Sequence, residues 1–141
     1  MRSHPWIDER LAEVPLFNGL SKKQLRTVSS LATALELPAG KVLMTEGGGG
    51  YEFVVIEAGQ VEVRRGDRVI ATRGPGDYIG EIALVEHRPR TATVVATTPV
   101  TIAVIGRREF QGMLDEMPDV AAKIKVTAEE RLAALSGKPS T

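Results

Sequence analysis

Between Leu37 and Ile105 the chain is a series of short β-branched runs separated by glycine, and few folds accept such a pattern. Gly59-Gln60 and Gly66-Asp67 have the composition of tight hairpin turns, which need a residue with positive φ. Short strands at this spacing indicate an antiparallel β-barrel or jelly roll rather than a parallel sheet. The runs cover residues 42–44, 53–56, 61–63, 69–71, 93–95 and 101–105.

Both flanks of this region have helical periodicity instead. From Trp6 to about Leu35 apolar residues recur at the spacing of a helix face, and Ser21 is placed to cap the helix. Near the other end, two helices are expected on either side of Pro118. The sequence therefore predicts one domain, with a helical segment at 1–36, a β-roll at 37–105, helices at 107–115 and 119–135, and a tail at 136–141.

The composition excludes several classes of function. Lysine and arginine number 18, as do aspartate and glutamate, so the chain lacks the positive field of a protein that binds nucleic acid or an anionic membrane. Cysteine is absent, which excludes disulfides, thiolate metal sites and cysteine nucleophiles. His4 and His87 have no further ligand at metal-binding spacing, so we expect no metal. Without a membrane span or a signal peptide, we expect a cytoplasmic protein.

The stretch at residues 76–93 interrupts the strands and contains the residues with the clearest chemistry. The helical turn expected from Gly80 onward has unpaired backbone amides, which favour an anion. Small side chains at Gly80 and Ala83 let a ligand approach that backbone closely. Arg90 follows a proline-stiffened loop and can pair with a phosphate, whereas Glu81 can accept hydrogen bonds from the hydroxyl groups of a ribose. Together these residues predict a receptor for a sugar phosphate.

The same stretch, Gly80-Glu81-Ile82-Ala83-Leu84 through Pro89-Arg90-Thr91-Ala92-Thr93, resembles the phosphate-binding cassette of cyclic nucleotide-binding domains. Such domains occur in protein kinase regulatory subunits, cyclic nucleotide-gated channels and the bacterial catabolite activator protein. The resemblance implies a mainly β fold, an eight-stranded antiparallel β-jelly roll (double-stranded β-helix) with N-terminal helices and two C-terminal helices. It also implies a non-enzymatic receptor for cAMP, with cGMP as a further ligand. It extends to residues 14–21, 53–63, 74–77 and 99–110.

The resemblance assigns roles to individual residues. Glu81 would bind the ribose 2′-hydroxyl, Arg90 would bind the cyclic phosphate, and Thr127 in the last helix would contact the adenine amino group. Ala128 stands where the activator protein has a serine, and no aromatic residue follows Phe110 to form a lid. The phosphate cradle would be completed by backbone amides of Gly80, Ile82 or Ala83, and Thr91.

Thr91 and Thr127 give opposite indications about the base. A threonine after the arginine resembles the residue that bonds the guanine amino group in cGMP-dependent kinases, whereas Thr127 resembles an adenine contact. One hydroxyl contributes only about 0.5–1.5 kcal/mol net. We therefore expect both nucleotides to bind, with cAMP the tighter by no more than roughly a hundredfold, and Thr91→Ala to weaken cGMP.

Other interpretations stay open. Glu81 and Arg90 can be a structural ion pair in a loop. The chain can also be a nucleotide-blind dimerisation or interaction module of the same fold, against which the intact Glu81 and Arg90 argue, whereas the altered loop at Tyr51 leaves it open. The domain can also be the sensory fragment of a transcription regulator, because residues 136–141 are too few for a DNA-binding domain. The apolar stripe of the last helix can pack on its own domain or on a second chain, as a homodimer. Its members are Val120, Ile124, Thr127, Ala128, Leu132 and Leu135. The sequence identifies no downstream effector and no nucleophile–base pair of an enzyme.

Overall fold

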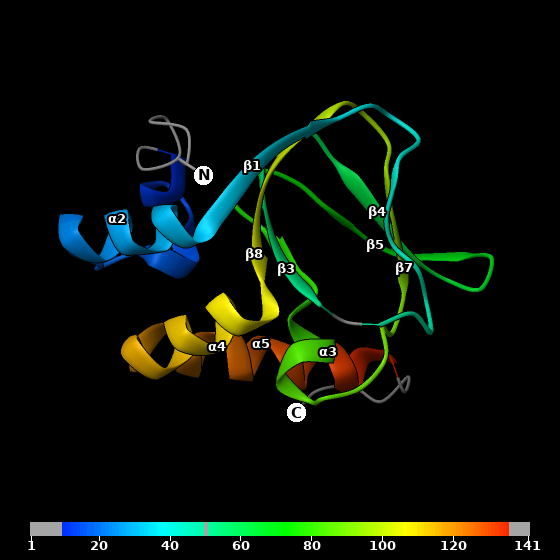
Figure 1. Ribbon diagram of the computed structural model, residues 1–141. Coiled ribbons are helices and arrows are strands. Elements are labelled where there is room, and N and C mark those ends of the chain that lie inside the picture. Colours follow the sequence, from blue (N-terminus) through cyan, green and yellow to red (C-terminus); the bar gives the residue numbers. More distant parts are fainter. Residues whose placement is uncertain (1–9, 50, 136–141) are drawn as a thin grey trace.

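The computed structural model describes residues 10–49 and 51–135, which form two four-stranded antiparallel sheets facing each other (Figure 1). The strand orders are β1-β8-β3-β6 in the first sheet and β2-β7-β4-β5 in the second. This arrangement confirms the jelly roll that the sequence predicts. The strands are β1 (Ala32–Leu37), β2 (Val42–Met44), β3 (Glu52–Ala58), β4 (Val61–Arg65), β5 (Arg68–Arg73), β6 (Tyr78–Ile79), β7 (Thr93–Ala96) and β8 (Val100–Gly106).

Helices pack on the outer face of the first sheet and leave the second sheet uncovered (Figure 1). The long helix α5 runs beneath the roll, and the short helix α3 lies beside it. The elements are η1 (Pro15–Phe17), α2 (Lys22–Leu31), α3 (Glu81–Val85), α4 (Arg107–Glu116) and α5 (Pro118–Leu135). The predicted helix start at Trp6 and the tail at 136–141 lie outside the described residues.

Two apolar clusters explain why β3 and β8 are nearly continuous hydrophobic runs. One cluster fills the space between the sheets and includes Ile56 and Ile102, both at most 2% exposed. The other lies between the first sheet and the helices and includes Phe53, Ile105 and Phe110. Strands buried on both faces need apolar residues at successive positions rather than in alternation. The two central strands of the first sheet therefore contribute side chains to both clusters.

The helix predicted to run to about Leu35 ends four residues earlier, which corrects the predicted segment 1–36. Helix α2 stops at Leu31, and β1 begins directly at Ala32. Every residue of β1 faces a residue of β8 in antiparallel register, and this pairing satisfies the backbone groups of the segment. Leu35, which continued the helical spacing, is 41% exposed. Long-range strand pairing thus outweighs a local periodicity that fits both structures.

Other local predictions are confirmed. The Ser21 hydroxyl accepts a hydrogen bond from the Gln24 backbone N–H at 3.1 Å, and the Gln24 side chain accepts one from the Ser21 N–H. This is the capping box that starts α2. Gly59 and Gly66 have φ of 86° and 57°, as their turns require. The bounds of α4 and α5 differ from the predicted ones by one residue.

The apolar stripe of α5 packs on its own domain. Val120, Ile124 and Ala128 are at most 1% exposed, and the first two belong to the cluster between the first sheet and the helices. These three side chains are therefore not available to a second copy of the chain. Among the described residues, no helix is both long enough and apolar enough to cross a membrane.

Candidate functional site

A cavity of about 350 Å³ opens between the β4–β5 hairpin, the cassette at residues 76–93 and the C-terminal end of α5. Six of the seven site residues predicted from the sequence line this cavity. They are Gly80, Glu81, Ile82, Ala83, Arg90 and Thr91. The fold therefore brings together residues from both ends of the cassette around one space of the size that suits a small ligand.

Gly80 connects strand β6 to helix α3 and lines the cavity. The pairing of β6 with β3 places it, and it caps α3 in the left-handed conformation, with φ of 92°. A Cβ atom there would lie 2.7 Å from the Glu52 carbonyl oxygen and 2.8 Å from the Arg90 Nη1 atom. Only glycine combines this backbone with this closeness, so the chain can turn into α3 directly beside Arg90.

Arg90 is held in place by two backbone carbonyls. Its Nη1 donates to the Gly80 oxygen at 3.0 Å, and its Nη2 donates to the Glu52 oxygen at 2.8 Å. The residue is only 8% exposed, and this burial lowers its pKa, although the nearby Glu52 and Glu81 carboxylates raise it. A guanidinium has five N–H donors, so three remain for an anion in the cavity. The structure positions the charge without neutralising it.

Glu81 is the most deeply buried charged residue of the site, at 1% exposure. Its partner is not Arg90 but Arg131 of α5, whose Nη1 donates to the two carboxylate oxygens at 2.9 and 3.0 Å. Burial raises the pKa of Glu81, and the Arg131 guanidinium acts in the opposite direction. The structural ion pair between Glu81 and Arg90 that the sequence left open is therefore not formed.

Arg131 is a site residue that sequence reasoning missed. Beyond its bond to Glu81, its Nη1 donates to the Tyr78 carbonyl at 2.7 Å, and the guanidinium lies 5.1 Å from the centre of the Tyr78 ring. It also forms an ion pair with Asp77 at 3.8 Å. Nothing in the sequence pairs Arg131 with residues some 50 positions earlier, because only the docking of α5 beside α3 brings them together.

Thr127 does not line the cavity. It lies near the side chain of Tyr78, whose pKa is raised above its ordinary value mainly by burial, while the proximity of Thr127 acts in the opposite direction. The part of α5 that lines the cavity is one turn farther on, at Arg131, Ala134 and Leu135. The adenine contact of Thr127 stays a prediction, and it is not favoured by the absence of this residue from the cavity lining.

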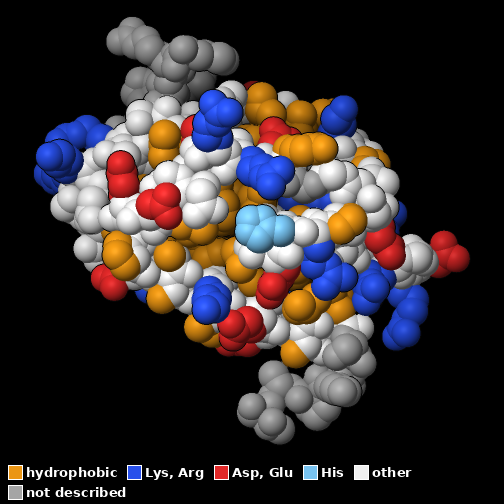
Figure 2. All heavy atoms as spheres, turned by 60° about the horizontal axis from the view of Figure 1, so that its bottom comes forward, with side chains coloured by type: hydrophobic (Ala, Val, Ile, Leu, Met, Phe, Trp, Pro, Cys, Tyr) orange, Lys and Arg blue, Asp and Glu red, His pale blue; other side chains and the backbone are white. Residues whose placement is uncertain are grey.

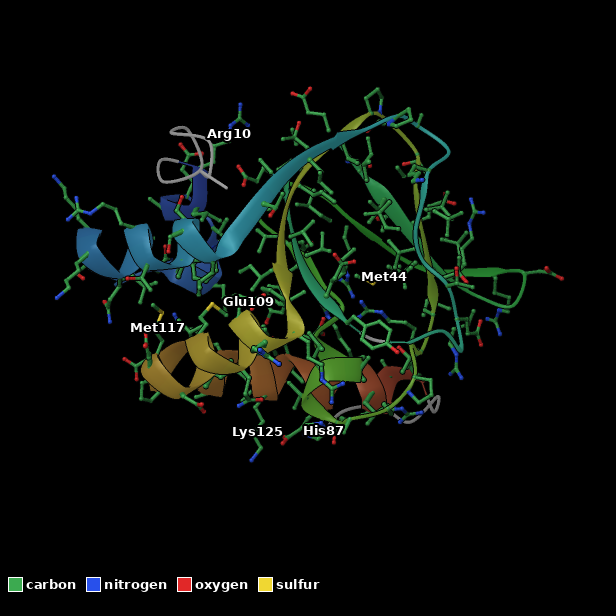
Figure 3. All side chains as sticks on the ribbon, in the orientation of Figure 1. Arg10, Met44, His87, Glu109, Met117 and Lys125 are labelled. Atoms are coloured by element: carbon green, nitrogen blue, oxygen red, sulfur yellow. The ribbon has the colours of Figure 1, made fainter. Side chains whose placement is uncertain are left out.

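The rest of the cavity wall is apolar with a basic rim. Met44, labelled in Figure 3, lies inside the roll at the cavity wall, whereas His87 lies on the outer loop after α3. Arg65, Arg68 and Arg73 of the β4–β5 hairpin also line the cavity. On the face shown in Figure 2, acidic and basic side chains are interspersed around His87 rather than segregated. The described residues include no cluster of three His, Asp or Glu able to hold a metal ion.

Proteins of one family are similar to this chain. The family model described as a cyclic nucleotide-binding domain matches residues 34–117. The cAMP-dependent protein kinase regulatory subunit of Yarrowia lipolytica is 36% identical over 114 residues, which are 79% of this chain and 30% of that protein. The Pycsar effector protein XpPycTIR of Xanthomonas perforans is 37% identical over 100 residues, which are 70% of this chain and 33% of that protein. The chain thus spans about a third of the length of these curated relatives.

A solved structure of Sp-2Cl-cAMPS bound to PKAR CBD2 has the same fold. The TM-score is 0.79, and the match covers 95% of this chain and 91% of that one. The sequence identity is 23%, so this likeness establishes the fold alone. The shared fold extends over nearly the whole of both chains.

Proposed function

The chain belongs to the cyclic nucleotide-binding domain family, and from that membership we propose that it is a non-enzymatic receptor whose cavity takes up a cyclic nucleotide, cAMP among them. The observation that carries this proposal is the convergence of Arg90 and Glu81 on one cavity, at the left-handed Gly80 cap. A fixed cation and a buried acceptor that line the same cavity match the phosphate and the ribose of one ligand.

In this proposal the phosphate binds to the Arg90 N–H groups that the two carbonyls leave free. The backbone amides at the start of α3 and at Thr91 add donors, because the first amides of a helix have no partner within it. Glu81 accepts from the ribose 2′-hydroxyl, a neutral donor that a buried carboxylate tolerates beside a phosphate. The apolar wall around Met44 and Val63 covers the remaining surface of the ligand.

We further propose that occupancy is relayed through α5. Glu81 holds Arg131, so a ribose hydroxyl that bonds the same carboxylate competes with the guanidinium or adjusts its position. Arg131 is anchored on the Tyr78 carbonyl as well, which links the cassette, β6 and α5 in one hydrogen-bonded group. A ligand that changes the strength of this link changes the equilibrium position of α5.

Calorimetric titration of the chain with cAMP and with cGMP tests the proposed receptor. Binding is expected for the parent, and Arg90→Ala is expected to abolish it because a phosphate would be left in the cavity without its cation, at a cost of about 2–5 kcal/mol. Arg88→Ala is the matched control, since Arg88 is an exposed arginine of the same loop that does not line the cavity.

The control keeps binding in the expected outcome. A nucleotide-blind module of the same fold would give no heat with any cyclic nucleotide. If Arg90→Ala bound the nucleotide as tightly as the parent, the assignment of the phosphate site would be contradicted. Thermal melts of each variant without ligand show whether the fold is retained.

A further inference from the structure

The sulfur atoms of this chain all belong to methionines, because cysteine is absent. Of the three methionines that the structure describes, Met44 of β2 lines the cavity and the other two do not. Met113 and Met117 belong to the cluster between the first sheet and the helices. Figure 3 shows Met44 inside the roll and Met117 beside α4. The fold therefore places one oxidisable thioether at the candidate ligand site.

Met44 meets Arg90 at Gly80. A Cβ atom at Gly80 would lie 2.8 Å from the Met44 Cε atom and 2.8 Å from the Arg90 Nη1 atom. The methyl end of the thioether and the guanidinium thus lie on the same side of Gly80, which has no side chain to separate them. Because the Met44 Sδ atom is one bond from Cε, an oxygen atom bonded to this sulfur would be within reach of the guanidinium.

The surroundings of Met44 make its sulfur the most accessible of the described methionines. Met44 pairs with Val94 of β7 and belongs to the cluster between the two sheets, which fixes the direction of its side chain. It is 7% exposed, against 4% for Met117 and 0% for Met113. A small oxidant that enters the cavity of about 350 Å³ therefore contacts Met44 without any opening of the core.

The chemistry open to such a sulfur is oxygen transfer from a hydroperoxide. The sulfur lone pair attacks one peroxide oxygen, so an S–O bond forms while the O–O bond breaks, and hydrogen peroxide leaves as water. The sulfur loses two electrons, which the peroxide gains. The product is a sulfoxide, a polar group in place of a flexible apolar one. The unmodified thioether is only a weak hydrogen-bond acceptor.

We propose that Met44 is a site of oxidation by hydroperoxides, and that its sulfoxide lowers the affinity of the cavity for a cyclic nucleotide. Arg90 donates to the Gly80 and Glu52 carbonyls and keeps three N–H donors, which the proposed function gives to the phosphate. The sulfoxide oxygen competes for these donors and adds a polar group to an apolar wall. The effect on affinity rests on the proposed function, whereas the reactivity of Met44 depends on the structure alone.

The reactivity is tested on the parent chain with hydrogen peroxide and peptide mass spectrometry, which measures the oxidation rate of each methionine. Met44 is expected to react about tenfold faster than Met113 and Met117, because those two are packed in the core. Saturating cAMP is expected to slow the reaction of Met44 and to leave the other two rates unchanged. Equal rates at the three residues, or a Met44 rate that bound cAMP does not change, would overturn the proposed site.

The effect on affinity is tested by calorimetric titration with cAMP before and after peroxide treatment, each protein being compared with itself. The Kd of the parent is expected to rise about tenfold and to return after incubation with methionine sulfoxide reductase and a thiol. Met44→Leu should lose this response, because leucine has a similar volume and no sulfur. The matched control is Met117→Leu, which removes a buried thioether outside the cavity and should respond as the parent does.

Two results would contradict the effect on affinity. Peroxide could leave the affinity of the parent unchanged although mass spectrometry shows Met44 oxidised, or Met44→Leu could respond as strongly as the parent. Thermal melts after treatment are expected to show a folded protein, and an unfolded one would mean that oxidation acts on the core instead. An untreated parent that gives no heat with cAMP or cGMP would overturn the proposed function, and the oxidation rates would then decide the fate of the Met44 site alone.

Discussion

Two glutamates of the described residues are buried, and their surroundings differ. Glu81, at the start of α3, is 1% exposed and is bonded through its two oxygens to Arg131. Glu57, near the end of β3, is 8% exposed, and neither of its carboxylate oxygens has a hydrogen-bond partner. Glu81 therefore has a hydrogen-bonded cationic partner, whereas the carboxylate oxygens of Glu57 are buried with no hydrogen-bond donor.

The difference shows in how each carboxyl responds to its surroundings. Burial raises the pKa of Glu57 to about 7, and the charge of Arg10, labelled in Figure 3, lowers it only in part. A register shift between Ile56 and Ala58 places Glu57 at an irregular point of the ladder. The fold thus supplies Glu81 with a hydrogen-bonded partner from α5, whereas it supplies none to Glu57.

Removal of Arg131, the partner of Glu81, should produce the largest effect, and that effect is on the free energy of unfolding. Arg131→Ala leaves Glu81 buried without its guanidinium, so the free energy of unfolding is expected to fall by about 3–5 kcal/mol. Urea denaturation at pH 7 measures this change. Glu130→Ala, an exposed neighbour on α5, is the control and should change stability by less than about 0.5 kcal/mol.

A double variant sharpens the result. Glu81→Ala combined with Arg131→Ala removes the stranded charge, so it should be more stable than Arg131→Ala alone. Equal midpoints for the parent and Arg131→Ala would mean that Glu81 does not need its partner, and the contrast with Glu57 would disappear.

The ligand role of Glu81 should produce the next largest effect. Glu81→Ala is expected to weaken cAMP by about ten- to hundredfold, because a hydrogen bond to a charged group contributes about 1.5–3 kcal/mol. The affinity for 2′-deoxy-cAMP should hardly change, since that analogue lacks the hydroxyl which Glu81 accepts. Titration of both ligands checks this, and equal losses for the two would remove the ribose role. Glu57→Ala, the buried glutamate outside the cavity, should leave both affinities unchanged.

Replacement of Glu57 should produce the smallest effect, a change in how the free energy of unfolding depends on pH. The folded-state pKa of about 7 lies above the ordinary value of 4.5, so the folded protein holds this proton more firmly than the unfolded chain. The associated stability is present below pH 4.5 and is lost as the pH rises to about 7. Glu57→Gln should therefore reduce the loss of stability between pH 5 and pH 8 by about 1–2 kcal/mol.

Urea denaturation at a series of pH values measures the slope for the parent and the variant. Glu36→Gln, at an exposed position of β1, is the control and should retain the parent slope. Identical slopes for the parent and Glu57→Gln would show that Glu57 is ionised or solvated in the folded protein at all these pH values.

Several parts of the molecule were predictable because their causes are local. The turns at Gly59 and Gly66 need positive φ, the Ser21 cap needs only the next three residues, and the strands of the roll are apolar runs bounded by such turns. Arg90 and Gly80 lie within one cassette, where a short chain segment fixes their separation. The cavity lining confirms that these two residues come together with the other cassette residues.

Other parts depended on contacts between distant segments. The sequence at residues 32–35 fits a helix as well as a strand, and pairing with β8 decides between them. The partner of Glu81, the absence of Thr127 from the cavity lining and the bond between Arg65 and the Leu135 carbonyl all follow from how α5 docks. The isolation of Glu57 likewise depends on which side chains the fold places around it.

By itself, then, the amino-acid sequence determined the class of fold and the residues of the cassette, because turn chemistry, capping and strand periodicity act over a few residues. Only the tertiary structure decided that Arg131 holds Glu81 and that Arg131 rather than Thr127 lines the cavity. These contacts join positions some 50 residues apart, and their geometry is set by the packing of a whole helix on a whole sheet, which no short segment encodes.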